Sequence, residues 1–174
     1  MKPFYLFGAL GCAIVIVFVS ASLVREFERE SLPVVFDRPG SLNAEDAISP
    51  AFVSFGGKDV PVRPGEFRDG AWTLSYKYVH HLIDSAYMGQ KGNMVIYGHN
   101  TASLFEGLAY VTEGDAIVVQ GIAGEKKEYK VADVLVVGSD NVEALAERYP
   151  EQLTLYTCTG FLDSKRLVVV AKAD

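Results

Sequence analysis

The sequence has 174 residues, a length that favours one folded domain with an appendage over two domains. Its 22 acidic residues outnumber its 16 lysines and arginines, so the net charge is −6. No basic cluster longer than Lys126-Lys127 occurs, and no aromatic residues interleave with a basic stripe. The composition therefore argues against a nucleic-acid-binding protein.

The first feature along the chain is an uncharged apolar segment at residues 3–24. At about 1.5 Å per residue it reaches about 33 Å, and a bilayer core is about 30 Å thick. We expect residues 1–24 to be a transmembrane anchor with a short N-terminal stub. A signal peptide cleaved near Ala21 is the alternative, but the run exceeds the roughly 7 to 15 residues of a secretory apolar region. A lipoprotein signal ending at Cys12 is disfavoured by Ala9 three places before it.

Residues 25–50 are charged and contain three prolines, which indicates a stalk between the membrane and a domain. Lys2 lies on one side of the apolar segment, and Arg25 and Arg29 lie on the other, so the positive-inside rule does not decide the topology. We adopt a single-pass protein in the cell membrane, with the domain at residues 51–174 on the extracellular side.

Within residues 51–174, short apolar runs alternate with Gly, Pro and Asp, a pattern typical of strands. The predicted strands are 51–55, 60–62, 72–76, 94–99, 115–122, 129–138, 153–158 and 166–172. Apolar residues at helical spacing predict one short helix at 76–87, and a second is predicted at 141–149 with Asn141 as its cap. Many short strands with one or two helices predict a mainly β protein with a closed or nearly closed barrel.

Cys158 is the first candidate for chemistry. The only other cysteine, Cys12, lies in the apolar segment, so an exported domain would carry one unpaired thiol, either reactive or buried and inert. If the strands around Cys158 and Arg166 pair as a hairpin, the two residues meet at its mouth, with Cβ atoms roughly 4.5 to 5.5 Å apart. A guanidinium there could donate to an oxyanion beside the sulfur or favour the thiolate, or could simply be solvated.

His99 is the second candidate, because it follows Gly98 at the end of a predicted strand. An imidazole titrates near neutrality, so it can give a proton to a leaving amine and later take one from a nucleophile. A surface or capping histidine is the alternative. His80 and His81 are adjacent in the predicted helix and point in different directions, so we interpret them as structural rather than as metal ligands.

Three segments, in this order, resemble the sortase family: GNMVIYGHN, LFEGLAYVTEGDAIVV and LTLYTCTGFLDSKRLVVVAK. Sortases carry a Thr-Leu-x-Thr-Cys strand, which is similar to Thr154-Leu155-Tyr156-Thr157-Cys158. Their catalytic histidine follows a glycine, as His99 follows Gly98, and their arginine lies on the next strand, as Arg166 does.

The resemblance implies an eight-stranded sortase barrel with Cys158 as nucleophile, His99 as general acid and base, and Arg166 at the oxyanion. It also implies that Thr157 contacts the substrate. The cysteine would attack a carbonyl in the sorting signal of an exported protein, often of the Leu-Pro-x-Thr-Gly kind. The thioester would then pass to an amine of a cell-wall precursor or a pilin.

We expect no cofactor and no metal, since the acidic residues show no recognisable calcium-ligand pattern. The loop between Cys158 and Arg166 is short, so little of it can act as a lid. An L,D-transpeptidase is one alternative, but those enzymes place a Ser-His-Gly-Cys type run at the nucleophile. The other is a non-catalytic, membrane-tethered β-barrel binding module with an inert Cys158.

Overall fold

The computed structural model describes residues 48–69, 71–141, 145–146 and 149–173. The expected anchor at 1–24, nearly all of the expected stalk at 25–50 and most of the expected helix at 141–149 lie outside these residues. Over the part of the chain that is described, no helix is long and apolar enough to cross a membrane.

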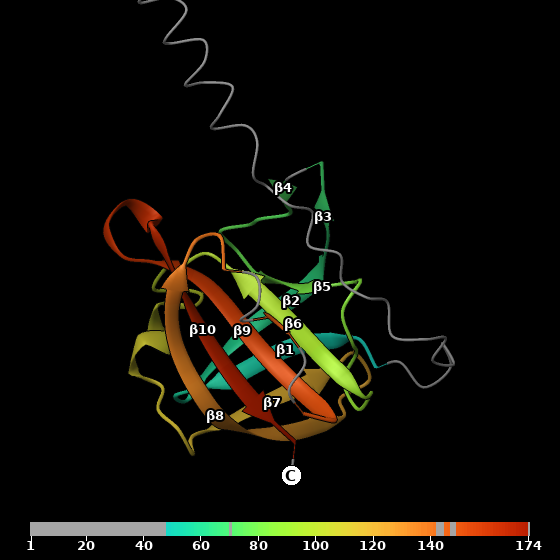
Figure 1. The fold of residues 1–174 in the computed structure, drawn as a ribbon. Coiled ribbons are helices and arrows are strands. Elements are labelled where there is room, and N and C mark those ends of the chain that lie inside the picture. The colour runs from blue at the N-terminus through green and yellow to red at the C-terminus, as the bar shows by residue number, and fades with distance from the viewer. Residues whose placement is uncertain (1–47, 70, 142–144, 147–148, 174) are drawn as a thin grey trace, which may run out of the picture. The chain divides into compact units, whose positions relative to one another are not determined.

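Eight strands close into a barrel in the order β1-β2-β5-β6-β9-β10-β8-β7, and this confirms the predicted mainly β, eight-stranded fold (Figure 1). The barrel strands are β1 (Pro50–Phe55), β2 (Lys58–Gly65), β5 (Val79–Leu82), β6 (Gly92–Gly98), β7 (Ala116–Gly121), β8 (Lys126–Gly138), β9 (Glu151–Thr159) and β10 (Lys165–Lys172). A separate hairpin, β3 (Phe67–Arg68) and β4 (Ala71–Trp72), is inserted between β2 and β5. The 3₁₀ segments η2 (Glu106–Tyr110) and η4 (Phe161–Asp163) lie in loops.

Alternation along the strands separates an inner core from an outer layer. On β9, Leu153 and Leu155 join the main buried cluster, whereas Tyr156 packs with a different cluster on the other face. The main cluster draws residues from all eight barrel strands, and it includes the fully buried Leu108 of η2 and Phe105 directly before η2. Burying one such large apolar side chain contributes about 1.5–3 kcal/mol, so this core stabilises the barrel.

The predicted helix at 76–87 is wrong. Its centre forms β5, which pairs in parallel with β2 and antiparallel with β6, and every residue of β5 is buried. Pairing on both edges satisfies the backbone and overrides the helix-like spacing of the apolar residues. The predicted strand at 72–76 is also wrong beyond Trp72, because the chain leaves the hairpin there and runs as a loop to Val79.

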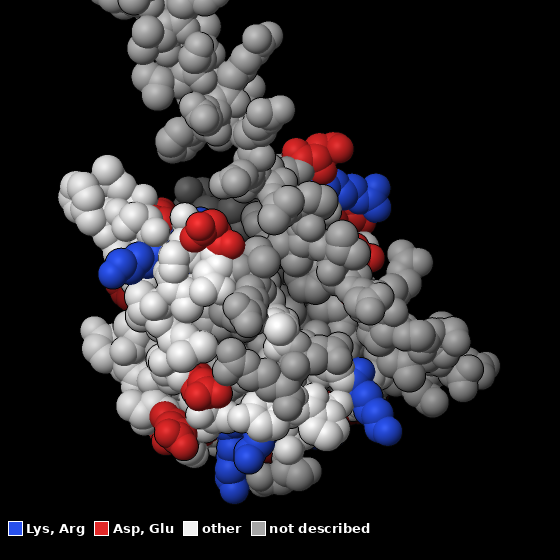
Figure 2. Space-filling view, in the orientation of Figure 1, with Lys and Arg blue, Asp and Glu red and all other residues white. Residues whose placement is uncertain are grey.

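Charged side chains are scattered over the described surface. Figure 2 shows the Lys and Arg side chains, and the Asp and Glu side chains, in small groups of either sign on this face. Two ion pairs occur between described residues, Arg68 with Glu66 and Lys127 with Glu151. The pattern offers no continuous positive surface on this face, in agreement with the composition.

Candidate active site

Two parallel strands bring His99 and Cys158 together. β6 and β9 are hydrogen-bonded neighbours, and their register pairs Gly98, the last residue of β6, with Thr157, near the end of β9. The Thr157 hydroxyl donates to the Gly98 carbonyl oxygen over 2.8 Å and fastens the two strand ends to each other. His99 and Cys158 each follow directly, on strands about 4.8 Å apart.

The glycine before His99 has a steric cause. A Cβ atom at Gly98 would lie 2.6 Å from Val79 Cγ1 and 3.1 Å from Val79 Cβ, on the neighbouring strand β5. Val79 is fully buried and β-branched, so it has little freedom to move aside. The glycine therefore allows β6 to pass close to β5 and fixes the position from which His99 emerges.

The direction of the side chains follows from the pleat. Thr157 is buried with the inner face of the barrel, so its neighbour Cys158 points to the outer face together with Tyr156. Cys158 is half-buried and forms no disulfide with any described residue, and His99 is also half-buried. Both side chains can therefore be reached from outside the barrel.

Arg166 completes the group from the third strand. The antiparallel register of β9 and β10 pairs Arg166 directly with Cys158, which puts both side chains on one face. Burial raises the pKa of the Cys158 thiol, the Arg166 charge lowers it, and the carboxylate of Asp163 raises it. The net pKa is above the ordinary value, so the resting thiol is protonated at neutral pH and the guanidinium partly offsets the cost of ionising it.

The loop between Cys158 and Arg166 is held by the arginine itself. Arg166 Nη1 donates to the carbonyl oxygens of Asp163 (2.6 Å) and Lys165 (2.9 Å). Leu162 and Asp163 have φ angles of 51° and 57°, in the left-handed region that costs a non-glycine residue about 1–2 kcal/mol. A guanidinium has five N–H donors, so these contacts leave donors for a ligand beside the sulfur.

Sequence reasoning missed two aromatic residues of this site. Tyr156 lies two residues before Cys158 on the same face, and its pKa is raised by burial and lowered by the charge of Arg166 and a hydrogen bond from it. Strand alternation predicts Tyr156 on the same face as Cys158, but the sequence alone assigned it no role in the site. Tyr76 stacks on the ring of His99, with centroids 4.2 Å apart and planes at 6°. No sequence pattern indicates that contact, because the hairpin insertion creates it.

The remaining predicted residues have other surroundings. Thr157 is 1% exposed, and its hydroxyl contacts Gly98, so substrate contact by this side chain stays a prediction. His81 is buried against Ala86 and Ser85. His80 is buried too and stacks on Tyr97, with its Nδ1 hydrogen-bonded to the Pro64 carbonyl oxygen. The two histidines lie on a strand, where adjacent side chains point to opposite faces.

A thiol, an imidazole and a guanidinium thus stand at the ends of three adjacent strands of a closed barrel, which is the layout of an enzyme that uses a cysteine nucleophile. The Sortase domain family matches residues 54–174, about 70% of the chain. The chain belongs to the sortase family, whose members are cysteine transpeptidases.

Individual relatives agree with this assignment. Sortase A of Bacillus anthracis is 33% identical over 84 residues, a match that spans 47% of this chain and 40% of that protein. A lid mutant of sortase A from Corynebacterium diphtheriae superposes with a TM-score of 0.60 and 32% identity, covering 76% of this chain and 75% of that one. Sortase C1 of Streptococcus agalactiae, in complex with MTSET, gives a TM-score of 0.59 and 29% identity, covering 71% of this chain and 67% of that one.

Proposed function

We propose that this protein is a membrane-anchored cysteine transpeptidase that acts on the sorting signals of exported proteins. The observation that carries the proposal is the register of β6, β9 and β10, which sets His99, Cys158 and Arg166 side by side at one end of the barrel. His99 is distant in sequence from Cys158 and Arg166, and the parallel pairing of β6 with β9 brings its strand beside theirs.

In the first step, the Cys158 thiol passes its proton to His99 while the sulfur forms a bond to a backbone carbonyl carbon of the substrate. The C–N bond of that peptide then breaks, and the departing amine takes the proton from His99. The products are a thioester on Cys158 and a free amine. Because burial raises the pKa of Cys158, transfer of its proton to a base is needed for attack at neutral pH.

In the second step, an acceptor amine attacks the thioester carbonyl carbon. A new C–N bond forms, the S–C bond breaks, and the proton lost by the amine returns to Cys158 through His99. Both steps place a negative charge on the carbonyl oxygen, next to the sulfur. Arg166 is paired with Cys158 across the hairpin, so its guanidinium stabilises that charge in both steps.

The biological setting belongs to the same proposal. The uncharged segment at residues 3–24 supports a membrane anchor, and the barrel lies on the extracellular side in this proposal because its substrates are exported. The substrates are then exported proteins with a C-terminal sorting signal, and the acceptor is an amine of a cell-wall precursor or a pilin. The similarity to sortases A and C supports this substrate class and leaves the sorting motif to experiment.

Mass spectrometry can test the proposal directly. The protein is incubated with a library of sorting-signal peptides, and we expect an adduct on Cys158 that corresponds to the acyl part of the cleaved peptide. Addition of an amine should release the acyl part as a new amide. Cys158→Ala should give neither adduct nor product. Turnover by that variant would refute the assignment of the nucleophile.

The variant His99→Ala distinguishes the transpeptidase from a merely reactive thiol. Loss of proton transfer to the leaving amine should lower turnover by about 100- to 10,000-fold. MTSET, the compound bound in the streptococcal relative, should still label Cys158 completely in this variant at pH 9, where solvent hydroxide supplies the thiolate, because labelling needs an accessible thiolate but no proton transfer to a leaving amine. Normal turnover by His99→Ala would remove the imidazole from the mechanism.

A further inference from the structure

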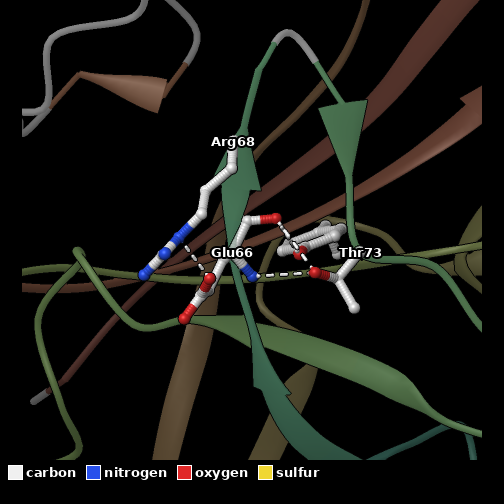
Figure 3. Close-up of polar contacts among 4 residues, drawn as sticks. Glu66, Arg68 and Thr73 are labelled. Carbon is white, nitrogen blue, oxygen red and sulfur yellow. Dashed lines mark hydrogen bonds and ion pairs between the residues drawn. The ribbon is translucent and has the colours of Figure 1, made fainter.

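The β3–β4 hairpin is anchored firmly beside the candidate site. Thr73 closes it, since the Thr73 backbone N–H (2.9 Å) and the Thr73 hydroxyl (3.2 Å) both donate to the Glu66 carbonyl oxygen, and the Glu66 N–H donates to the hydroxyl (3.2 Å). Figure 3 shows these hydrogen bonds between Glu66 and Thr73, with the Glu66 and Arg68 ion pair beside them. The Tyr97 hydroxyl donates to the same Glu66 carbonyl oxygen over 3.3 Å and ties the hairpin to β6.

Aromatic packing adds a second anchor. The ring of Trp72 lies 4.5 Å from that of Tyr97 and 6.3 Å from that of Tyr156, so it bridges the two strands that carry His99 and Cys158. Phe67 packs on Trp72 from the other strand of the hairpin. The loop that follows Trp72 therefore starts from a fixed point on the outer face, and four residues later it places Tyr76 over His99.

Tyr76 stacks on His99 although most of its surface is exposed to solvent. Tyr76 is 72% exposed, yet its ring lies parallel to the imidazole within 6° at 4.2 Å. Among the described residues, none forms a hydrogen bond with the side chain of His99. Within that part of the chain, stacking is therefore the contact that orients this imidazole.

Stacking suits the chemistry expected of His99. A hydrogen-bonded partner would occupy one ring nitrogen and fix its tautomer. A stacked ring instead fixes the plane of the imidazole and leaves both nitrogens at its edge, where one can face the sulfur and the other the amine. The face of a tyrosine also attracts a cation, so it stabilises the imidazolium formed when His99 has taken the thiol proton.

We propose that Tyr76, held in place by the β3–β4 hairpin, is a positioning residue for His99 that orients the imidazole by stacking. The proposal rests on the proposed function for its kinetic consequence, but the contact itself can be measured without substrate. Tyr76 acts through His99 and forms no bond to the reacting atoms.

The first readout is the NMR spectrum of the imidazole C–H groups of the full-length protein in detergent. The chain has three histidines, so the His99 signals are assigned by their loss in His99→Gln. A parallel ring close above the imidazole shifts its protons upfield. We expect Tyr76→Ala to move the His99 signals downfield and Tyr76→Phe to leave them in place, with the His80 and His81 signals unchanged as a check of the fold.

The second readout separates kcat from KM on a sorting-signal peptide. An aromatic pair contributes about 0.5–1.5 kcal/mol, so Tyr76→Ala should lower kcat by about 2- to 12-fold while Tyr76→Phe restores it. Tyr110→Ala is the matched control, because Tyr110 is 82% exposed and makes no ring contact with a described residue. We expect wild-type kinetics from it.

Unchanged His99 signals in Tyr76→Ala would overturn the proposal. So would a rise in KM at constant kcat, because Tyr76 would then contact substrate instead of orienting His99. If the wild-type protein turns over no peptide, the proposed function fails, and the NMR comparison still decides whether Tyr76 orients the imidazole.

Discussion

The two ends of the barrel use polar side chains in opposite ways. At the start of β9, the carboxylate of Glu151 accepts hydrogen bonds from Lys127 Nζ (2.5 Å), the Tyr129 hydroxyl (2.9 Å) and the Gly89 N–H (3.0 Å). At the end of the same strand, about 23 Å away by strand geometry, the described residues give the His99 side chain only a stacked ring, and the Cys158 thiol is half-buried.

This difference indicates that the Glu151 end contributes stability and that the Cys158 end is suited to chemistry. The Glu151 group is nearly saturated with partners, as expected of polar atoms that hold a fold closed. At the other end, protein contacts hold the strand ends, through Thr157 and Gly98, and leave reactive atoms accessible. Substitutions at the Glu151 end should therefore lower stability, and those at the Cys158 end should lower activity.

The largest loss of activity at the Cys158 end is expected from Arg166→Lys. An ammonium cannot reproduce the fork of donors that a guanidinium presents, so stabilisation of the oxyanion is lost. Loss of one such donor typically lowers the rate by about 100- to 1,000-fold. Peptide cleavage should fall by this factor in kcat/KM, while thermal unfolding shows a fold close to wild type. Near-normal rates would reduce Arg166 to a structural residue that holds its loop.

Alkylation of Cys158 by iodoacetamide separates the charge of Arg166 from its geometry. Because the Arg166 charge lowers the pKa of Cys158, Arg166→Gln should raise that pKa further and slow alkylation at neutral pH. Arg166→Lys keeps a positive charge and should react more nearly like wild type. Equal slowing in both variants would mean that the position of the guanidinium, and not its charge, controls the thiol.

The arrangement of Cys158 and Arg166 was predictable from the sequence, because it depends only on two strands that are adjacent in the chain. Alternation on β9 and the next strand places Cys158 and Arg166 on one face, and the observed register pairs them directly. The position of His99 beside Cys158 was not predictable in this way, since it depends on parallel pairing of β6 with β9, more than 50 residues apart. Only the resemblance to sortases supplied it.

The errors in the sequence interpretation cluster around β5. Val79, Leu82 and Ala86 have the spacing of a helix face, but β5 is short and gains both its neighbours from distant parts of the chain. Local pattern cannot report such pairing. The predicted helix at 76–87 also contains Tyr76, whose contact with His99 joins two residues distant in the sequence and therefore escaped prediction as well.

A smaller effect, a loss of stability at acid pH, is expected from the protonation of His81. Burial lowers the pKa of His81 to about 4, from 6.5 in an unfolded chain. Below pH 6.5 the unfolded chain binds a proton that the folded protein does not bind until about pH 4. The free energy of unfolding should therefore fall by about 3 kcal/mol across this window and then level off.

Urea denaturation at pH 7 and pH 4 can measure this contribution. His81 Nε2 lies 2.9 Å from the Ala86 carbonyl oxygen and donates to it. Glutamine can donate an amide hydrogen there and does not titrate, so His81→Gln should lose less stability between the two pH values than wild type does. Equal losses in the two proteins would show that other groups govern the acid sensitivity.

The smallest effect is expected at the Glu151 end, from Glu151→Gln. This substitution keeps the shape of the side chain but removes the charge that binds Lys127 and the buried Tyr129 hydroxyl. Hydrogen bonds to a charged group contribute about 1.5–3 kcal/mol, and the glutamine oxygen retains part of this. We expect the free energy of unfolding to fall by about 1–2 kcal/mol, with peptide cleavage unchanged.

Tyr129→Phe is the matched control, since it removes one of the three hydrogen bonds to Glu151 and should lower the free energy of unfolding by less. Loss of cleavage in a fully folded Glu151→Gln protein would show that the two ends are coupled, and the division between a stabilising end and a reactive end would no longer hold.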